Sequence, residues 1–236
     1  MGKMPPPHPL IELRDASVAG VRANLIPGIA LWILGSAVVF VYYSVGAARP
    51  GFEWIMELSQ TYGFLYSGVA TAVFGGLIPF LYLLATGRIP SGKVRTWCLF
   101  FVIYWSIRGI EVDAFYRLQN WLFGGGTDWQ TIATKVLVDQ FIYCPFWAAP
   151  MTAVCYAWKG ENFSWRRLRE RVDQRFFLFE IPSVLLSTWI VWIPATAIIY
   201  SLPLPLQMPL FNLVLCFFVL LVSVLAPQDE RSRMDT

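Results

Sequence analysis

The sequence predicts an all-α protein, a polytopic membrane helix bundle of about six transmembrane helices with both termini on the inner side. Composition is the first observation, since 57% of the 236 residues are hydrophobic, only 14% are charged, and the mean hydropathy is +0.55. A soluble domain is usually about 45–50% apolar and about 25% charged. The composition therefore excludes a disordered chain, a coiled coil and a nucleic-acid-binding domain, and it disfavours a soluble enzyme.

Six apolar stretches, each near the length that crosses a bilayer, are the second observation. A hydrocarbon core about 30 Å thick needs about 20 apolar residues in a helix. The expected spans cover residues 25–48, 62–86, 97–123, 131–158, 176–200 and 209–226. Glycine, proline or charged clusters separate them, as is typical of helix ends and turns. We therefore expect a polar tail over 1–24, the bundle over 25–226 and a second polar tail over 227–236.

The distribution of Lys and Arg is the third observation, and it sets the orientation. With six spans and the N-terminus inside, fourteen of these residues fall on the inner side: Lys3, Arg14, Arg22, Arg88, Lys93, Arg95, Lys159, Arg166, Arg167, Arg169, Arg171, Arg175, Arg231 and Arg233. The outer loops hold only Arg49. This asymmetry is what the positive-inside rule predicts for an N-in, C-in protein. The sequence favours the bacterial inner membrane over an organelle membrane.

The third span carries charges, which must face the bundle interior, water or an interface. One half of its helical wheel holds the polar residues Arg108, Asp113, Tyr116, Arg117, Gln119 and Asn120. Glu111 is the exception, about 60° from Arg108 at 100° per residue. Arg108 and Glu111 are spaced i,i+3, and Asp113 and Arg117 are spaced i,i+4. Both pairs can therefore neutralise within the helix.

The fourth span adds Lys135, Asp139 and Tyr143 in one stripe, with Gln140 nearby on the wheel. Pro145 then disturbs the hydrogen-bond ladder. The short turn over 124–126 would make the third and fourth spans antiparallel neighbours whose polar faces meet. We expect Asp139 to pair with Lys135 or with an arginine of the third span. The charges of the two spans sum to zero, which favours a satisfied buried network over a proton relay.

Small residues form two adjacent rows along the second span at i+4 spacing, Ser67, Thr71 and Gly75 beside Gly68, Ala72 and Gly76. Such rows let helix backbones approach closely in lipid. They predict close packing within the chain or, alternatively, a contact face of a homo-oligomer.

The sequence contains no motif that is typical of catalysis or of cofactor binding. It contains no H-E-x-x-H, G-x-S-x-G or P-loop motif. Its four cysteines, Cys98, Cys144, Cys155 and Cys216, lie in apolar runs, and its one histidine is His8. We therefore expect no catalytic residues, no metal and no cofactor. The expected partners are the lipid bilayer and small solutes, and not nucleic acid.

Two blocks of the third and fourth spans, with a Trp-Pro element of the fifth, resemble the Mpv17/PMP22 family of small integral membrane proteins. The similarity covers roughly residues 100–225, and the residues that carry it are Arg108, Gly109, Tyr116, Lys135, Asp139, Gln140, Pro145, Trp192 and Pro194. The family's Gly-Pro and His before the aromatic–Tyr pair are absent here. The resemblance implies a channel-like protein that passes small solutes with weak selectivity.

Two interpretations follow for the polar residues of the third and fourth spans. The first is a seam between these helices that lines a solute path. The second is a non-conducting structural or adaptor membrane protein, whose buried charges only fix helix packing.

Overall fold

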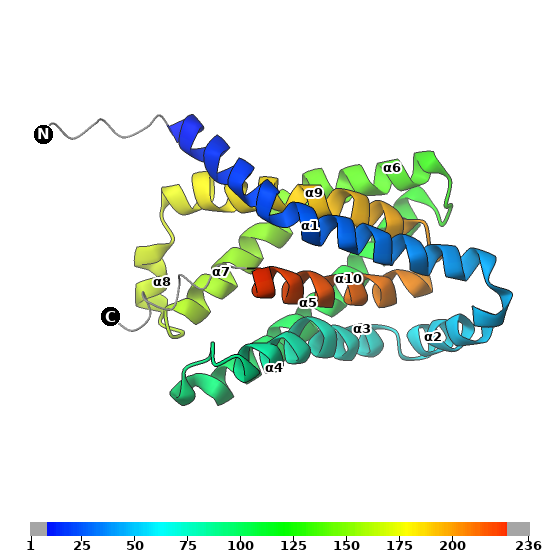
Figure 1. Ribbon diagram of the computed structural model, residues 1–236, viewed down its shortest axis with the longest axis horizontal. Coiled ribbons are helices and arrows are strands. Elements are labelled where there is room, and N and C mark those ends of the chain that lie inside the picture. Colours follow the sequence, from blue (N-terminus) through cyan, green and yellow to red (C-terminus); the bar gives the residue numbers. More distant parts are fainter. Residues whose placement is uncertain (1–8, 226–236) are drawn as a thin grey trace, which may run out of the picture.

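The computed structural model describes residues 9–225, and within this range every element is helical and no strand is present. In chain order the elements are α1 (Pro9–Ser44), η1 (Gly46–Ala48), α2 (Arg49–Tyr62), α3 (Phe64–Thr71), η2 (Ala72–Leu77), α4 (Ile78–Ala85), η3 (Ser91–Lys93), α5 (Val94–Phe123), α6 (Trp129–Val138), η4 (Asp139–Ala148), α7 (Ala149–Gly160), α8 (Trp165–Arg171), η5 (Phe176–Glu180), α9 (Ile181–Tyr200) and α10 (Leu204–Leu225). The all-α prediction is therefore confirmed for the described chain (Figure 1).

Four helical segments of the described chain are long and apolar enough to cross a membrane: Ile11–Ser44, Phe64–Ala85, Phe176–Tyr200 and Leu204–Val224. They correspond to the first, second, fifth and sixth expected spans. The third and fourth expected spans lie on α5 and on the continuous helix formed by α6, η4 and α7. Both of these helices carry charged residues, Arg108 and Asp113 on the former and Lys135 and Asp139 on the latter.

Several helix boundaries differ from those expected from sequence, and α10 begins at Leu204 instead of residue 209. Helix α1 begins at Pro9, so the expected boundary at residue 24 lies within one continuous helix. Asn24 is buried and donates a hydrogen bond from its side-chain amide to the Ser187 carbonyl oxygen, which ties the middle of α1 to α9. Helix α2 fills a region where only a turn was expected. The expected tail over 227–236 lies outside the described residues.

Proline and wide turns shape the fourth expected span. Asp128 is the N-cap of helix α6, and its carboxylate accepts hydrogen bonds from the backbone N–H groups of Gln130 and Thr131. The Thr131 N–H lowers the pKa of this carboxyl. Segment η4 contains Pro145 and is π-helical, and the Ala149 N–H bonds to the Cys144 carbonyl oxygen five residues back. Since proline removes one backbone donor, this i→i+5 pattern is the expected disturbance of the ladder.

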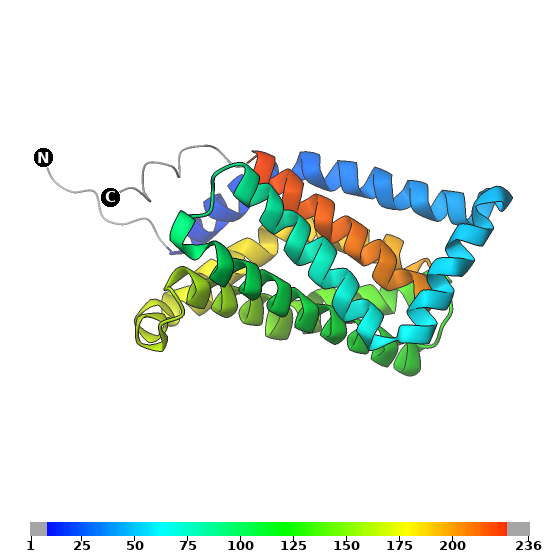
Figure 2. The ribbon, with the colours of Figure 1, turned by 90° about the horizontal axis from the view of Figure 1, so that it is seen from below.

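The long helices run between two ends of the molecule. The start of α1, helix α8 and the turn between α4 and α5 lie at one end, while α2 and the turn between α5 and α6 lie at the other (Figures 1 and 2). At that second end Gly124 adopts φ +84°, which L-residues with side chains rarely adopt. The polypeptide therefore reverses direction sharply between α5 and α6.

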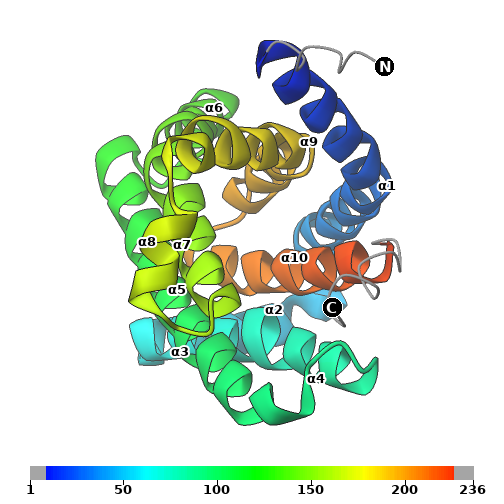
Figure 3. The ribbon, with the colours of Figure 1, turned by 90° about the vertical axis from the view of Figure 1, so that its left-hand side faces the viewer.

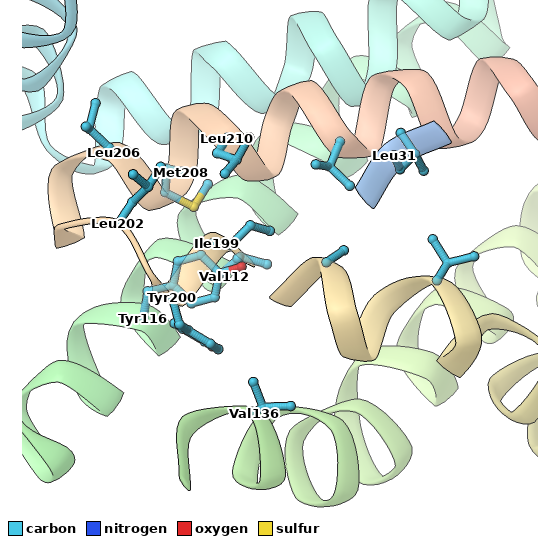
Figure 4. Packing of buried hydrophobic residues seen from close by; sticks show 13 residues of the cluster. Leu31, Val112, Tyr116, Val136, Ile199, Tyr200, Leu202, Leu206, Met208 and Leu210 are labelled. Carbon is cyan, nitrogen blue, oxygen red and sulfur yellow. The ribbon is translucent and has the colours of Figure 1, made fainter. Parts of the chain in front are cut away.

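Helix α10 is the central element of the bundle. It lies between α1 and α9 on one side and α3 and α4 on the other (Figure 3). Its buried side chains Leu206, Leu210 and Val214 join those of α9 and α1 in the main apolar core (Figure 4). Helix α1 packs along α9, where Gly28 and Gly35 contact Val191 and Ile198. Because these glycines carry no side chain, the two helices approach closely.

The small residues of the second expected span face α5. A Cβ on Gly76 would lie 2.8 Å from the Phe101 carbonyl oxygen, and one on Gly68 would lie 3.2 Å from Ile110 and Ser106. In return, a Cβ on Gly109 of α5 would overlap Ser67 and Thr71. A Cβ on Gly75 would meet Trp105 and Leu215. The rows therefore serve close packing within the chain.

Replacing Gly76 with leucine should wedge η2 away from α5, because the nearest obstacle is a backbone oxygen. Overpacking typically costs about 1–3 kcal/mol, so we expect a lower midpoint of thermal unfolding in detergent. The control is Gly51→Leu on α2, where nothing lies within 4 Å of the added Cβ. An unchanged midpoint for Gly76→Leu would contradict the close contact.

Candidate functional site

Glu111 of α5 is the centre of the first polar cluster. Its carboxylate is 2.6 Å from Nη1 of Arg108, so the predicted i,i+3 ion pair is formed. It also accepts hydrogen bonds from the Tyr143 hydroxyl and the Trp147 indole N–H of η4, the latter at 2.7 Å. Phe115 stacks on Tyr143 with ring centroids 4.0 Å apart. Glu111, the exception on the helical wheel of the third span, is thus the carboxylate that joins α5 to η4.

The second cluster lies on a different side of α5. Asp113 and Arg117 form the predicted i,i+4 ion pair at 2.9 Å. The Ser67 hydroxyl of α3 donates to Asp113 at 2.7 Å, and the Arg117 guanidinium lies 5.0 Å from the centre of the Phe64 ring. These charges are therefore directed to α3. The expectation of one polar face turned toward the fourth span is wrong for this pair.

Asp139 has no cationic partner within ion-pair distance in residues 9–225, so the expected pairing with Lys135 or an arginine of α5 is wrong. Its carboxylate instead accepts hydrogen bonds from the Tyr200 hydroxyl at 2.6 Å and from the Gln140 side-chain amide at 3.0 Å. Tyr200 in turn accepts from the Gln119 amide. A buried chain of neutral donors thus links α5, α9 and η4 at the Asp139 carboxylate. Figure 4 shows Tyr200 beside Tyr116 within the core.

Lys135 is 2% exposed, yet within the described chain its ammonium makes no ion pair or hydrogen bond. Its ammonium lies 5.9 Å from the centre of the Tyr200 ring, which gives a cation–π contact. The Asp139 N–H bonds to the Lys135 carbonyl oxygen, so the predicted i,i+4 backbone spacing is present, yet the two side chains do not pair. The Asp139 carboxylate instead bonds to the Tyr200 hydroxyl, while the Lys135 ammonium lies against the ring of the same tyrosine.

A cavity of about 460 Å³ lies between α5, the helix η4–α7, the helix η5–α9 and α10. Along η5–α9 its wall is one stripe of residues: Phe176, Glu180, Val184, Thr188, Trp192 and Thr196. At 1.5 Å per residue this stripe extends over ~30 Å of helix. The cavity is therefore elongated along the bundle. Its volume is within the range of small-molecule sites, about 300–1,000 Å³.

One end of the cavity lies near the basic segment over 159–175. Glu180 lines this end and pairs with Arg171 of α8 through two contacts, at 3.0 and 2.6 Å. Hydrogen bonding to Glu180 raises the pKa of Arg171 above its usual value. This ion pair fixes the short helix α8 against the start of the fifth expected span.

The residues proposed from sequence divide into two groups. Arg108, Tyr116, Asp139, Gln140, Tyr143 and Trp192 line the cavity. Glu111, Asp113, Arg117 and Lys135 do not, and neither do Gly68, Thr71, Gly75, Gly76, Gly109, Pro145 and Pro194. Pro194 instead lines an open apolar groove between α1, α6 and α9.

Sequence reasoning missed Tyr200 and Asn212. Tyr200 connects Gln119 to Asp139, and Asn212 of α10 accepts the Thr71 hydroxyl at 2.7 Å. Both are almost fully buried. The available signal was an isolated polar residue in or beside an apolar span, since lipid offers such a residue no partner.

Residues 9–225 contain no group of three or more His, Cys, Asp or Glu side chains that could hold a metal ion. The four cysteines are free and lie on separate parts of the bundle. No family model, curated protein or solved structure matches the chain.

Tyr200→Phe should lower the free energy of unfolding by about 1–3 kcal/mol, because it leaves buried partners of the hydroxyl unsatisfied. Asp139→Asn should cost less in the Tyr200→Phe background than alone, since the two residues share one interaction. Unfolding in detergent measures both. The control is Tyr43→Phe, which removes an exposed hydroxyl that donates to the Ser201 carbonyl oxygen. Strictly additive effects would contradict the coupling.

Proposed function

We propose that this chain is a non-enzymatic integral membrane protein of six spans that passes small solutes with weak selectivity. The passage is the cavity between α5, η4–α7, η5–α9 and α10, so the third and fourth spans supply two of its walls. The proposed setting is the bacterial inner membrane, with both termini inside.

The lengths of the two charged helices support six spans. Helix α5 has 30 residues and is ~45 Å long at 1.5 Å per residue, more than the ~30 Å of a hydrocarbon core. Its charged residues Arg108 and Asp113 are buried within the bundle, while Ile103, Ile107 and Leu118 are exposed. This is the arrangement that a spanning helix with charges requires. The inner and outer turns then alternate as the positive-inside rule demands.

The elongated cavity is the observation that carries the proposed passage. It combines apolar walls with a few polar groups, among them Arg108, Asp139 and Gln140. Polar groups at membrane depth mark solute pathways when they line a cavity. Five of the nine residues that carry the resemblance to the Mpv17/PMP22 family line this same cavity: Arg108, Tyr116, Asp139, Gln140 and Trp192. We extend the proposal to distant membership of that family.

A second candidate function is a non-conducting structural or adaptor protein. The observation that favours it is the internal pairing of Arg108 with Glu111 and of Asp113 with Arg117. Charges neutralised in this way can fix helix packing without any solute. Flux through the unmodified protein separates the two candidates.

Cysteine labelling tests the six-span topology. In a background without native cysteines, Gly92→Cys before α5 should be labelled from the inner side and Gly125→Cys after α5 from the outer side. The reason is that α5 lies between them and crosses the bilayer once. Labelling of both positions from the same side would mean that α5 does not span, leaving only the four apolar segments as spans.

Liposome flux with solutes of graded size tests the passage. We expect protein-dependent flux, and we expect Thr188→Trp to reduce it at least severalfold, because Thr188 lies midway along the cavity stripe. The matched control is Thr134→Trp, at an exposed position of α6 outside the cavity. Flux no greater than in empty liposomes would favour the structural candidate instead.

A further inference from the structure

The charged residues that line the cavity are Arg108, Asp139 and Glu180. Arg108 is neutralised by Glu111 at 2.6 Å, and Glu180 is neutralised by Arg171 at 2.6 Å. Within residues 9–225, Asp139 has no oppositely charged group within 4.0 Å. The cavity wall therefore carries one carboxylate whose charge no side chain of the described bundle pairs directly.

The hydrogen bonds of Asp139 leave room for a further donor. Its two oxygens accept one bond each, from Tyr200 and Gln140, whereas a carboxylate offers about four acceptor positions. The neighbouring Gln140 is 1% exposed, and its Oε1 has no hydrogen-bond partner in the described chain. This part of the wall thus has unused acceptors and a negative charge, the complement of a cation that carries N–H groups.

Aromatic rings form the wall around this part of the cavity. The Phe211 ring is 6.2 Å from Tyr116 and 5.9 Å from Trp192, so the three rings form a continuous array. Tyr116 is also 5.2 Å from Tyr200, which donates to Asp139. Aromatic faces attract cations, and the attraction is strongest where water is excluded. The same wall also accommodates the apolar part of a ligand.

Lys135, four residues before Asp139, does not occupy this place. Lys135 is not among the residues that line the cavity, and its ammonium lies against the Tyr200 ring. Lys135 and Asp139 thus contact different parts of Tyr200, the ring and the hydroxyl. The cavity side of Asp139 is therefore open to an external cation.

We propose that the cavity binds a small organic ammonium ion, a protonated amine with an apolar or aromatic body. Asp139 is its counter-ion, and Tyr116, Trp192 and Phe211 surround its apolar part. This inference assigns a ligand class to the cavity of the proposed passage, and it is tested by binding rather than by flux.

The test is calorimetric titration of the detergent-solubilised full chain at pH 7 with three near-isosteric probes. These are 2-phenylethylamine, which is protonated at this pH, neutral 2-phenylethanol and anionic 3-phenylpropionate. A hydrogen bond to a charged group predicts that the amine binds roughly tenfold or more tightly than the alcohol. The carboxylate should bind more weakly than either. Equal affinity for amine and alcohol would overturn the proposal, because the cavity would then be merely apolar.

Two variants locate the site. Asp139→Asn should reduce the preference for amine over alcohol to within about twofold, whereas Glu57→Gln, an exposed acid on α2, should leave it intact. Phe211→Leu removes no hydrogen bond, and we expect it to weaken amine binding by roughly threefold to tenfold and alcohol binding less. An unchanged preference for amine over alcohol in Phe211→Leu would place the amine elsewhere and overturn the inference. The same preference in folded Asp139→Asn protein would also overturn it.

Binding and flux have separate outcomes. Amine binding without flux would support the ammonium site and reject the passage. Flux without a preference for the amine would support the passage and reject the ammonium site.

Discussion

The burial of the charges of α5 is the constraint on which the rest of the structure depends. A buried charge is costly unless it is paired, so the buried Arg108 and Asp113 each need a partner within the bundle. Within the helix, Arg108 pairs with Glu111, and Asp113 pairs with Arg117. The remaining acceptors of both carboxylates then bind neighbouring helices. Helix α5 is thereby fixed between α3 on one side and η4 on the other.

The two sides of α5 reach their neighbours by different means. Toward α3 and η2 the approach is close, because glycines on both helices remove the side chains that would separate them. Toward η4 the contact is made by the long aromatic side chains of Tyr143 and Trp147, which reach Glu111. The first arrangement gives a tight helix pair. The second leaves space between α5 and its neighbours, and the cavity lies along this side.

The polar interior also depends on the irregular helix of the fourth expected span. Since Pro145 removes a backbone donor, η4 winds as a π-helix and presents Asp139 and Gln140 together. Asp139 then meets Tyr200 from the end of α9, and Lys135 is directed to the face of the same ring. A single tyrosine thus contacts both a carboxylate and an ammonium that do not pair with each other. This separation gives the cavity its one uncompensated charge.

The sequence by itself determined the all-α class, the positions of the apolar helices and the two ion pairs of α5, because these depend on local composition and helical spacing. The turn at Gly124 and the disturbed hydrogen-bond ladder at Pro145 could also be predicted from the sequence, because they too depend on local residues. Only the tertiary structure decided the partners of Asp139, the role of Tyr200 and the division of the polar face of α5 between two neighbours. Those contacts join residues 61 and 81 positions apart in the chain. They depend on how separate helices approach one another, which a wheel of a single helix does not contain.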